Sequence, residues 1–379
     1  MNGVFFGLFN FDPFKKAVLA NEDVYDSVFL NIVTAMSSAV SGYLYEIHEV
    51  PYLDFEKPWW LGNSVTEASV SNRSYFAVGD VNLASYESTP VIFFNKQMAA
   101  DNDITDLYEV VDSGSWTYDK MIEYCSSVGS DLDGDGVLGE NDRYGLALNG
   151  FSVFTMTYGG GFRMIEKDAD DLPYLNISEA FLSYLQKHIT TVAENSSILN
   201  GDTIAKGDIL RGVEIRKKAF QENRVLFYNE MLTMATMLRN METDFGILPM
   251  PKSDVSQKQY YSFFHNSNSS TVTVPVTNGD LDRTGRILED LLYQSYLLVR
   301  PAYFEKTVTA KMMRDETSER MLDLILSNII FDDALEPGVL DGMRTMFNKA
   351  NENLASALES KRESYEKKLE KIITAYTES

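Results

Sequence analysis

Short apolar runs alternate with stretches of helical periodicity along this chain, and that alternation constrains the fold more than any other feature of the sequence. Four runs have the length and composition of buried strands, and Pro249 and Pro251 close the last of them. The runs are residues 91–94, 144–148, 225–228 and 245–248. Strands interleaved with helices predict an α/β fold whose sheets are mainly parallel.

Helices are expected between and after these strands. Thr117 is an N-cap candidate with Asp119 in the first turn, and apolar residues follow at helical spacing. This spacing places Cys125 on the buried stripe, which favours a structural thiol over a reactive one. A second helix is expected over about residues 282–299. Residues 343–376 contain no Pro or Gly and predict one long helix, or two helices broken once.

The size and charge of the chain narrow its class. A length of 379 residues predicts two domains, which is the usual outcome above about 200 residues. The net charge of −23 repels phosphate and argues against a nucleic-acid partner or an anionic lipid surface. Cys125 is the only cysteine, so neither an intramolecular disulfide nor a cysteine-rich zinc site can form. No apolar run approaches the ~18–20 residues needed to span a bilayer.

The sharpest local motif is an acidic loop that fits D-x-D-x-D-G, the front of an EF-hand calcium loop. Carboxylates at alternate positions can converge on one hard cation, and an aspartate at the twelfth position has a shorter arm than the usual glutamate. The candidate calcium ligands are Asp131, Asp133, Asp135, the carbonyl of Val137, and Asp142. The functional interpretation is a structural calcium site, and the alternative is a solvated acidic turn between a helix and a strand.

Sequence signals for hydrolytic chemistry are weak. The three histidines lie in no metalloprotease motif, and no G-x-S-x-G nucleophile elbow is present. The pattern around His188 predicts a position on a helix surface. Trp60 follows Pro58 and Trp59, so one indole ring could face a cleft, as in sugar recognition, or both could attach a loop to the core. Tyr158 precedes three glycines, and we interpret this segment as a loop at the rim of a cleft.

Several segments then appear in a characteristic order. Leu-Tyr-Glu-Val-Val at 107–111 and Trp-Thr-Tyr-Asp-Lys-Met at 116–121 precede the acidic loop and Tyr-Gly-Leu-Ala at 144–147. With these, the chain resembles the extracellular solute-binding proteins, family 1, of ABC transporters. Further matching segments follow the family's order, at residues 43–44, 58–60, 94–96, 244–252 and 283–285. The resemblance covers the chain from about residue 22 to beyond 325.

The resemblance implies a type II periplasmic-binding-protein fold, in which two α/β lobes close on a ligand in the cleft between them. The first lobe would comprise residues 1–94 plus about 268–312, and the second about 98–265 plus 313–379. By loose analogy with maltodextrin-type relatives, three loops would line the cleft. With the two aromatic candidates above, the expected ligand-binding residues are Asn31, Thr34, Trp60, Asn149, Phe151, Ser152, Tyr158, Asn229 and Glu230.

The resemblance also implies a function. We expect a non-enzymatic, monomeric protein without catalytic residues that binds a carbohydrate and delivers it to an ABC transporter permease, with no nucleic-acid partner. Its location would be extracytoplasmic, as a lipoprotein on the cell surface or as a periplasmic protein. No cofactor is expected beyond the possible structural calcium. The alternatives are a carbohydrate-active hydrolase and a sugar-binding module that feeds a sensor.

The start of the chain departs from the family. Residues 1–6 contain no signal peptide, and no lipid-anchor cysteine is near them. Relatives place a signal, a strand and a helix before the segment that resembles residues 2–26, so we expect about thirty mature residues and the signal to be missing. A helix at 14–19 and a strand at 26–30 follow, and this strand would lack the parallel neighbour that it has in relatives.

Overall fold

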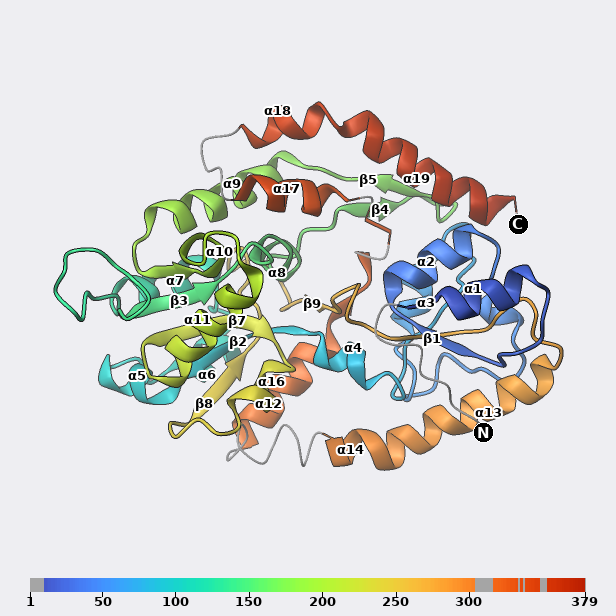
Figure 1. The fold of residues 1–379 in the computed structure, drawn as a ribbon, viewed down its shortest axis with the longest axis horizontal. Coiled ribbons are helices and arrows are strands. Elements are labelled where there is room, and N and C mark those ends of the chain that lie inside the picture. The colour runs from blue at the N-terminus through green and yellow to red at the C-terminus, as the bar shows by residue number, and fades with distance from the viewer. Residues whose placement is uncertain (1–9, 304–315, 333–334, 337, 348–352, 379) are drawn as a thin grey trace.

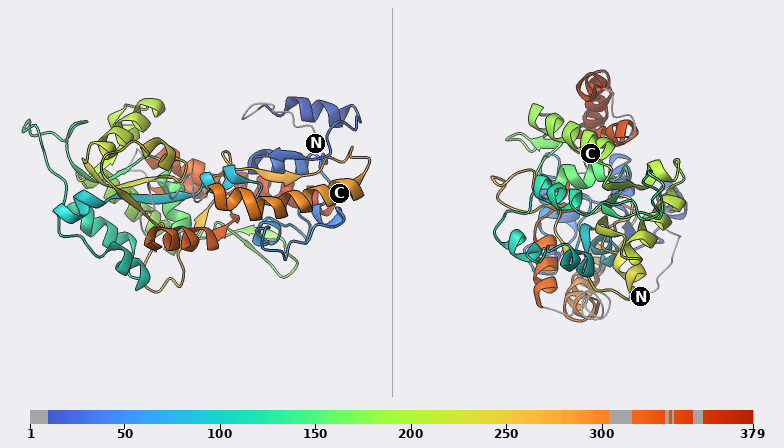
Figure 2. Two further views of the ribbon diagram at one scale, coloured as in Figure 1. Left: turned by 90° about the horizontal axis from the view of Figure 1, so that it is seen from below. Right: turned by 90° about the vertical axis from the view of Figure 1, so that its left-hand side faces the viewer.

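The computed structural model describes residues 10–303, 316–332, 335–336, 338–347 and 353–378. The chain forms two bodies that lie side by side and are joined by several crossing segments (Figures 1 and 2). We call the body that carries residues 12–40 lobe one and the body that carries the largest sheet lobe two. The expectations about the missing start and about a boundary at 312–313 fall on residues outside these described ranges.

Lobe two is built on a five-stranded sheet of order β6-β3-β7-β2-β8. The four runs predicted as strands are confirmed, because each forms one of these strands. β3 runs parallel to β6 and β7, whereas β2 is antiparallel to β7 and β8. β6, β3, β7 and β8 therefore run in one direction, as the expectation of mainly parallel sheets requires, and β2 is the exception, because it enters lobe two from lobe one and runs against its neighbours. The strands are β2 (Pro90–Asn95), β3 (Tyr144–Leu148), β6 (Ile198–Asn200), β7 (Val225–Met231) and β8 (Phe245–Leu248).

Helices cover both faces of this sheet (Figure 1). α7 begins after Thr117, whose side chain accepts a hydrogen bond from the backbone N–H of Lys120, so the predicted N-cap is confirmed. Cys125 is fully buried on α7, as its spacing predicts. The helices of lobe two are α5 (Lys96–Asp101), α6 (Leu107–Asp112), α7 (Tyr118–Ser126), α8 (Ser152–Gly159), α9 (Glu179–Glu194), α10 (Gly201–Ile204), α11 (Ile209–Gln221), α12 (Met234–Leu238) and α16 (Glu316–Ser327).

Lobe one contains a small antiparallel sheet of β1 (Val28–Leu30) and β10 (Thr271–Thr273). Ala77 forms a bridge to the other edge of β10, at Val272. The structure thus gives β1 an antiparallel partner from late in the sequence, and no second partner for β1 is found among the described residues. The helical segments of lobe one are α1 (Asp12–Leu19), α2 (Ile32–Val40), η1 (Ile47–Glu49), α3 (Asn63–Glu67), α4 (Leu83–Glu87), α13 (Leu281–Gln294), η2 (Ser295–Val299) and α14 (Arg300–Tyr303).

The predicted helix over 282–299 corresponds to α13 and the π-helical segment η2. Pro301 has no N–H to offer the preceding turn, which is consistent with the wider turn just before it. The expected single or once-broken helix over 343–376 is wrong, because the described residues there form three helices. They are α17 (Val339–Phe347), α18 (Leu354–Glu359), which Asn353 caps, and α19 (Arg362–Thr377).

Two small pairs of strands lie outside the main sheet. β4 (Ile165–Lys167) and β5 (Pro173–Leu175) form a hairpin that extends from lobe two over lobe one, beside α19 (Figure 1). β9 (Ser262–Phe263) pairs with β11 (Ile329–Ile330) where the chain crosses between the lobes.

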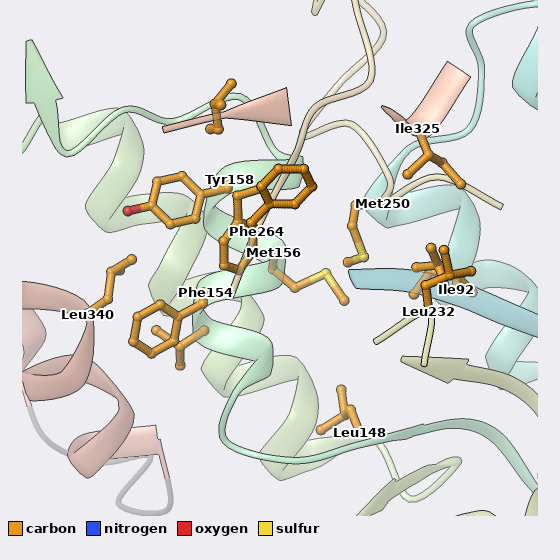
Figure 3. Packing of buried hydrophobic residues seen from close by; sticks show 14 of the residues in the cluster. Ile92, Leu148, Phe154, Met156, Tyr158, Leu232, Met250, Phe264, Ile325 and Leu340 are labelled. Atoms are coloured by element: carbon orange, nitrogen blue, oxygen red, sulfur yellow. The ribbon is translucent and has the colours of Figure 1, made fainter. Parts of the chain in front are cut away.

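The core of lobe two continues into these crossings. Figure 3 shows Leu340 of α17 near Phe154 and Tyr158 of α8, with Met156 and Met250 further along the same cluster. Lobe one has a smaller separate core around Trp60, Val272 and Leu288. Among the described residues, no helix is both long enough and apolar enough to cross a bilayer.

Candidate functional site

A polar segment, residues 265–270, carries the chain from lobe two back to lobe one, and we call it the crossing loop. Its conformation is fixed by its own backbone, since the N–H groups of Asn268 and Ser269 both donate to the carbonyl of His265, at 3.0 and 2.9 Å. The backbone N–H of His265 donates to the carbonyl of Ser88, on the segment that leads into β2, at 3.3 Å. Two crossings are therefore held together at this point.

The loop after β3 meets the crossing loop through stacked rings. The Phe151 ring stacks on the His265 ring, with centroids 4.7 Å apart and an interplanar angle of 24°. It also stacks on Phe154, one turn further along the chain, at 5.2 Å. Asn149 holds this loop, because its Oδ1 atom accepts a hydrogen bond from the Phe151 N–H at 3.1 Å. Phe151 is half-buried, so part of its ring remains accessible.

The end of β7 reaches the same place. Because β3 and β7 are parallel neighbours, their carboxyl ends lie at the same edge of the sheet. Asn229 is buried, and its Oδ1 atom accepts from the hydroxyl of Thr155 at 2.9 Å. Glu230 is half-buried and forms an ion pair with the buried Arg216 at 3.0 Å. Met231 ends the strand, and its sulfur lies 3.6 Å from the Nδ2 atom of Asn268 in the crossing loop.

Lobe one contributes the start of α2. Asn31 caps this helix, with its Oδ1 atom accepting from the N–H of Thr34 at 2.8 Å. The N–H of Ile32 donates to the hydroxyl of Ser269 at 3.2 Å. The start of α2, the loop after β3 and the end of β7 therefore all contact the crossing loop. The structure brings Asn31, Thr34, Asn149 and Phe151 to this junction. Asn229 and Glu230 instead lie within β7, before Met231, and are paired with Thr155 and Arg216.

Ser152 has a supporting position behind this junction. It is fully buried, and its hydroxyl lies 2.8 Å from Nε2 of His188, whose Nδ1 lies 3.0 Å from the hydroxyl of Tyr118. Burial lowers the pKa of His188 to about 3, so the imidazole is neutral and offers one donor and one acceptor to this chain. The predicted surface position of His188 is wrong, because α8, α7 and Phe347 cover that face of α9.

The two remaining aromatic candidates lie inside the lobes. Trp60 is 5% exposed, and its indole N–H donates to Glu289, as does that of Trp59, each at 2.9 Å. These contacts attach the loop to α13, which was the structural alternative for the pair. Tyr158 is fully buried, with its ring 4.9 Å from that of Phe263. Neither Trp60 nor Tyr158 offers a ring face to the junction.

Arg344 is a residue of this site that the sequence interpretation missed. A Cβ atom placed on Gly150 would lie 3.5 Å from its Nε atom and 2.8 Å from Oδ2 of Asp202, so these two charged groups flank Gly150. Asp202 accepts from the Gly150 N–H at 2.9 Å. The half-buried Arg344 forms no hydrogen bond or ion pair with any described residue. The sequence did contain an indication that Arg344 faces the interior. Arg344 lies one turn after Leu340, so it belongs to the apolar face of its helix.

His265 was also missed, although a run of polar residues between Phe264 and Val272 marks its loop. Burial lowers the pKa of His265 to about 4, and the positive charge of Arg344 acts in the same direction. The imidazole at the junction is therefore neutral at pH 7. The site thus combines a half-exposed aromatic platform, amide groups, a carboxylate and a guanidinium that has no partner among the described residues. Together these groups suit a ligand with many hydroxyl groups.

The acidic loop lies at the far end of lobe two from lobe one (Figure 1). Carboxylate oxygens of Asp131, Asp133 and Asp142 lie within 4.8 Å of one another. Asp135 is not in this group, and the Val137 side chain is 68% exposed. Asp142 accepts hydrogen bonds from the N–H groups of Leu132 and Gly139, at 2.8 and 2.6 Å, and they lower the pKa of its carboxyl group. These oxygen donors are of the kind that Ca²⁺ prefers.

No protein-family model matches the sequence, and no curated protein matches it. The fold, by contrast, is similar to that of solved ABC sugar-binding proteins. An ABC substrate-binding protein from Listeria monocytogenes, solved with cycloalternan, has a TM-score of 0.60 at 11% identity, over 95% of this chain and 89% of that one. The GacH receptor of Streptomyces glaucescens, solved unliganded and with acarbose, has a TM-score of 0.58 at 13% identity, over 94% and 87%.

The maltose/maltodextrin-binding domain MalE from Bdellovibrio bacteriovorus, bound to maltotriose, has a TM-score of 0.55 at 14% identity, over 97% of this chain and 87% of that one. These likenesses extend over almost the whole of each chain, so they confirm the expected two-lobed α/β binding-protein fold. At such low identity, the fold is what the comparisons establish.

Proposed function

We propose that this chain is the solute-binding component of an ABC import system and that it binds a carbohydrate between its two lobes. The observation that carries the proposal is the convergence of the start of α2, the loop after β3 and the end of β7 on the crossing loop at residues 265–270. The proteins of this fold named above were solved with cycloalternan, acarbose or maltotriose.

The side chains at the junction support this ligand class. The exposed part of the Phe151 ring can pack on the apolar face of a pyranose, as aromatic rings do in sugar sites. The Arg344 guanidinium can donate to ligand hydroxyls, and the free oxygen of Asp202 can accept from them. A neutral sugar suits this pair better than an acidic one, because an anionic group near Arg344 would also lie near Asp202.

We infer a mechanism of closure on the ligand. The loop after β3 and the end of β7 belong to lobe two, and the start of α2 belongs to lobe one, so a ligand held by all of them favours the closed arrangement of the lobes. Ser152 and His188 position the β3 loop from behind. The closed, loaded form would be the one that a permease recognises.

Binding without turnover is the more favoured function. Glu230 is already paired with Arg216, and Asp202 is held by the Gly150 N–H, which leaves no free pair of carboxylates at the junction in the described part of the chain. The Ser152–His188 contact is fully buried and out of reach of a substrate. A carbohydrate-active hydrolase and a sensor-feeding module remain the alternative outcomes. Incubation with oligosaccharides, followed by product analysis, tests the first. A search for permease genes beside the gene of this protein tests the second, since their presence would favour import.

We further propose that the chain acts as an extracytoplasmic monomer, tethered as a lipoprotein or free in the periplasm. The acidic loop would hold one structural Ca²⁺ through Asp131, Asp133 and Asp142, with Asp135 and the carbonyl of Val137 as the remaining expected ligands. A bound cation would neutralise the mutual repulsion of these carboxylates and tie the end of α7 to the start of β3.

The proposal is tested by a thermal-shift screen against a panel of glycans, followed by calorimetric titration of each hit. A ligand that binds only the native state raises the melting midpoint by mass action. We expect a neutral oligosaccharide to give a shift that saturates with concentration. If no glycan shifts the midpoint, and a panel of amino acids and peptides does, the proposed ligand class is wrong.

A further inference from the structure

A second place where the lobes meet lies on the side of the β4–β5 hairpin. A pocket of about 220 Å³ opens there, lined by Thr66 and Glu67 of lobe one, by Arg163 and Lys167 at the base of the hairpin, and by Asp332 of the last crossing segment. Its lining therefore comes from three parts of the chain that could move relative to one another.

The polar groups around this pocket are already paired with each other. Glu67 accepts hydrogen bonds from both terminal nitrogens of Arg163, at 3.0 and 3.4 Å, and from the backbone N–H of Phe331 at 2.7 Å. Asp332 is buried and accepts from the N–H groups of Met164 and Ile165, at 2.7 and 2.9 Å. Few polar groups here lack a hydrogen-bond partner that a ligand could replace. We therefore interpret the pocket as part of the contact between the lobes and not as a ligand site.

The hairpin is attached to lobe one at a second point. The Lys167 ammonium donates to the carbonyl of Thr66 at 2.7 Å, to the hydroxyl of Ser69 at 2.9 Å, and to Asp171 at 2.9 Å. Asp171 in turn accepts from the N–H of Asn72 through its side chain, at 2.8 Å, and from the N–H of Ser71 through its carbonyl, at 3.0 Å. The Lys167 and Asp171 side chains are about four-fifths buried, which protects these contacts from competing water.

The end of α19 adds a third attachment. Tyr376 is fully buried in lobe one, with its ring 4.7 Å from that of Tyr75 and its hydroxyl 3.4 Å from the sulfur of Met36. Arg73 donates to the carbonyl of Tyr376 at 3.0 Å. α19 also packs against β5, so the hairpin and the helix form one layer over lobe one (Figure 1).

We propose that this layer is a brace that limits how far the two lobes separate, with the Glu67–Arg163 ion pair as its releasable contact. The brace comprises the 163–175 segment and the end of α19, together with their partners on lobe one at residues 66–76. The Glu67 and Arg163 side chains are 29% and 31% exposed, against 18% and 19% for Asp171 and Lys167, so water can compete for the Glu67–Arg163 ion pair more readily than for the Lys167–Asp171 pair. Glu67 also receives the Phe331 N–H, so it links lobe one, the hairpin and a crossing segment at once.

The test measures the distance between the lobes in the protein without ligand. Cys125 is fully buried, so labels can be directed to two new cysteines on exposed positions, Lys16→Cys on α1 of lobe one and Lys218→Cys on α11 of lobe two. Glu67→Gln keeps the shape and an acceptor for the Phe331 N–H but removes the ion pair. Arg163→Gln removes it from the other side. Asp26→Asn, which breaks an ion pair with Arg283 inside lobe one, is the matched control.

We expect Glu67→Gln and Arg163→Gln to shift the label-to-label distribution to longer distances by the same amount, and the double variant to add nothing further. Asp26→Asn should leave the distribution unchanged. Distributions equal to that of the parent in both single variants would overturn the proposal. So would additive shifts in the double variant, because they would mean that the two residues act separately.

The brace is independent of the ligand's identity, since the distance measurement requires none. If a glycan is found, the wider distribution should also weaken apparent binding in proportion to the loss of the binding-competent arrangement. A failure of every glycan with an intact distance effect would therefore reject the proposed function and leave the brace standing.

Discussion

Phe151 and His265 stack face to face across the junction of the two lobes, with their centroids 4.7 Å apart. One ring belongs to the loop after β3, and the other to the loop that carries the chain back to lobe one. The pair therefore makes the position of the proposed ligand platform depend on the position of a crossing segment. A change in the angle between the lobes would move this platform relative to α2.

Phe151→Ala should weaken binding of the best glycan hit about tenfold, which corresponds to about 1.4 kcal/mol. The substitution removes both the ring face offered to the sugar and the stack that fixes the loop. Calorimetric titration measures the effect. Tyr52→Ala, which removes an exposed ring beside Asp282 of α13 in lobe one, is the control and should bind as the parent does. Equal affinities in both variants would remove Phe151 from the site.

Arg344→Gln should also weaken glycan binding, by three- to tenfold, with little change in the melting midpoint. The reason is that the guanidinium forms no hydrogen bond or ion pair with any described residue, so the fold loses little when it is replaced. Arg344→Lys keeps the charge but not the planar fork and should be intermediate. Arg320→Gln, which loses an exposed pair with Asp112, is the control. A large fall in the midpoint without a change in affinity would assign Arg344 to the fold instead.

The sequence predicted what depends on local pattern. The four strand runs, the cap at Thr117 and the burial of Cys125 follow from apolar spacing and capping chemistry, and the structure has all of them. The loops expected to line the cleft came from the family resemblance, by analogy with maltodextrin-type relatives, and their role in binding stays a prediction. The family resemblance, and not local pattern, supplied the two-lobed arrangement.

The features that the sequence did not predict depend on contacts between residues that are far apart in the chain. The antiparallel direction of β2 follows from where the chain enters lobe two. A local sequence pattern contains no information about this point of entry. His188 has the spacing of a surface position, but tertiary neighbours cover it. The segment before and at Trp60 resembles one that stacks on sugars. The indole N–H of Trp60 nevertheless donates to Glu289, more than two hundred residues later, and the ring lies in the core. Arg344 reaches the site only because α17 packs on α8.

The Ser152–His188–Tyr118 chain should make stability depend on pH. The folded-state pKa of His188 is about 3 against about 6.5 when unfolded, so its contribution is complete above pH 6.5 and is lost as the pH falls toward 3. His188→Gln should lower the urea midpoint at pH 7 and flatten the decline on the acid side. His48→Gln, at an exposed position, should do neither. An unchanged acid-side slope would show that His188 is not the group responsible.

Asp332 should make stability depend on pH in the opposite direction from His188. Burial raises its pKa to about 7, so the folded state holds a proton that the unfolded chain releases above about pH 4. This contribution is complete below about pH 4 and is lost as the pH rises to 7. Asp332→Asn should reduce that slope in a series of urea melts, although it costs one of the two hydrogen bonds from the N–H groups of Met164 and Ile165. The same slope in Asp332→Asn and in the exposed control Asp170→Asn would contradict the assignment.

If the acidic loop holds calcium, added calcium should raise the melting midpoint. A chelator should lower the midpoint of protein that was purified without any chelator. Asp133→Asn should abolish the response to added Ca²⁺, because it removes one of the three clustered carboxylates. Asp101→Asn, an exposed change elsewhere in lobe two, should retain it. Identical melting curves with calcium and with chelator would leave the loop as a solvated turn.

Of the three tryptophans, two lie in lobe one and one lies in lobe two, so their fluorescence can report on each lobe separately. Trp59 and Trp60 share one carboxylate of lobe one, whereas Trp116 is fully buried in lobe two and donates to the carbonyl of Pro249 at 2.9 Å. Each indole therefore senses the integrity of a single lobe. A Trp116→Phe variant would emit only from lobe one, and a variant with Phe at positions 59 and 60 only from lobe two. Fluorescence of the two variants during denaturation would reveal which lobe melts first.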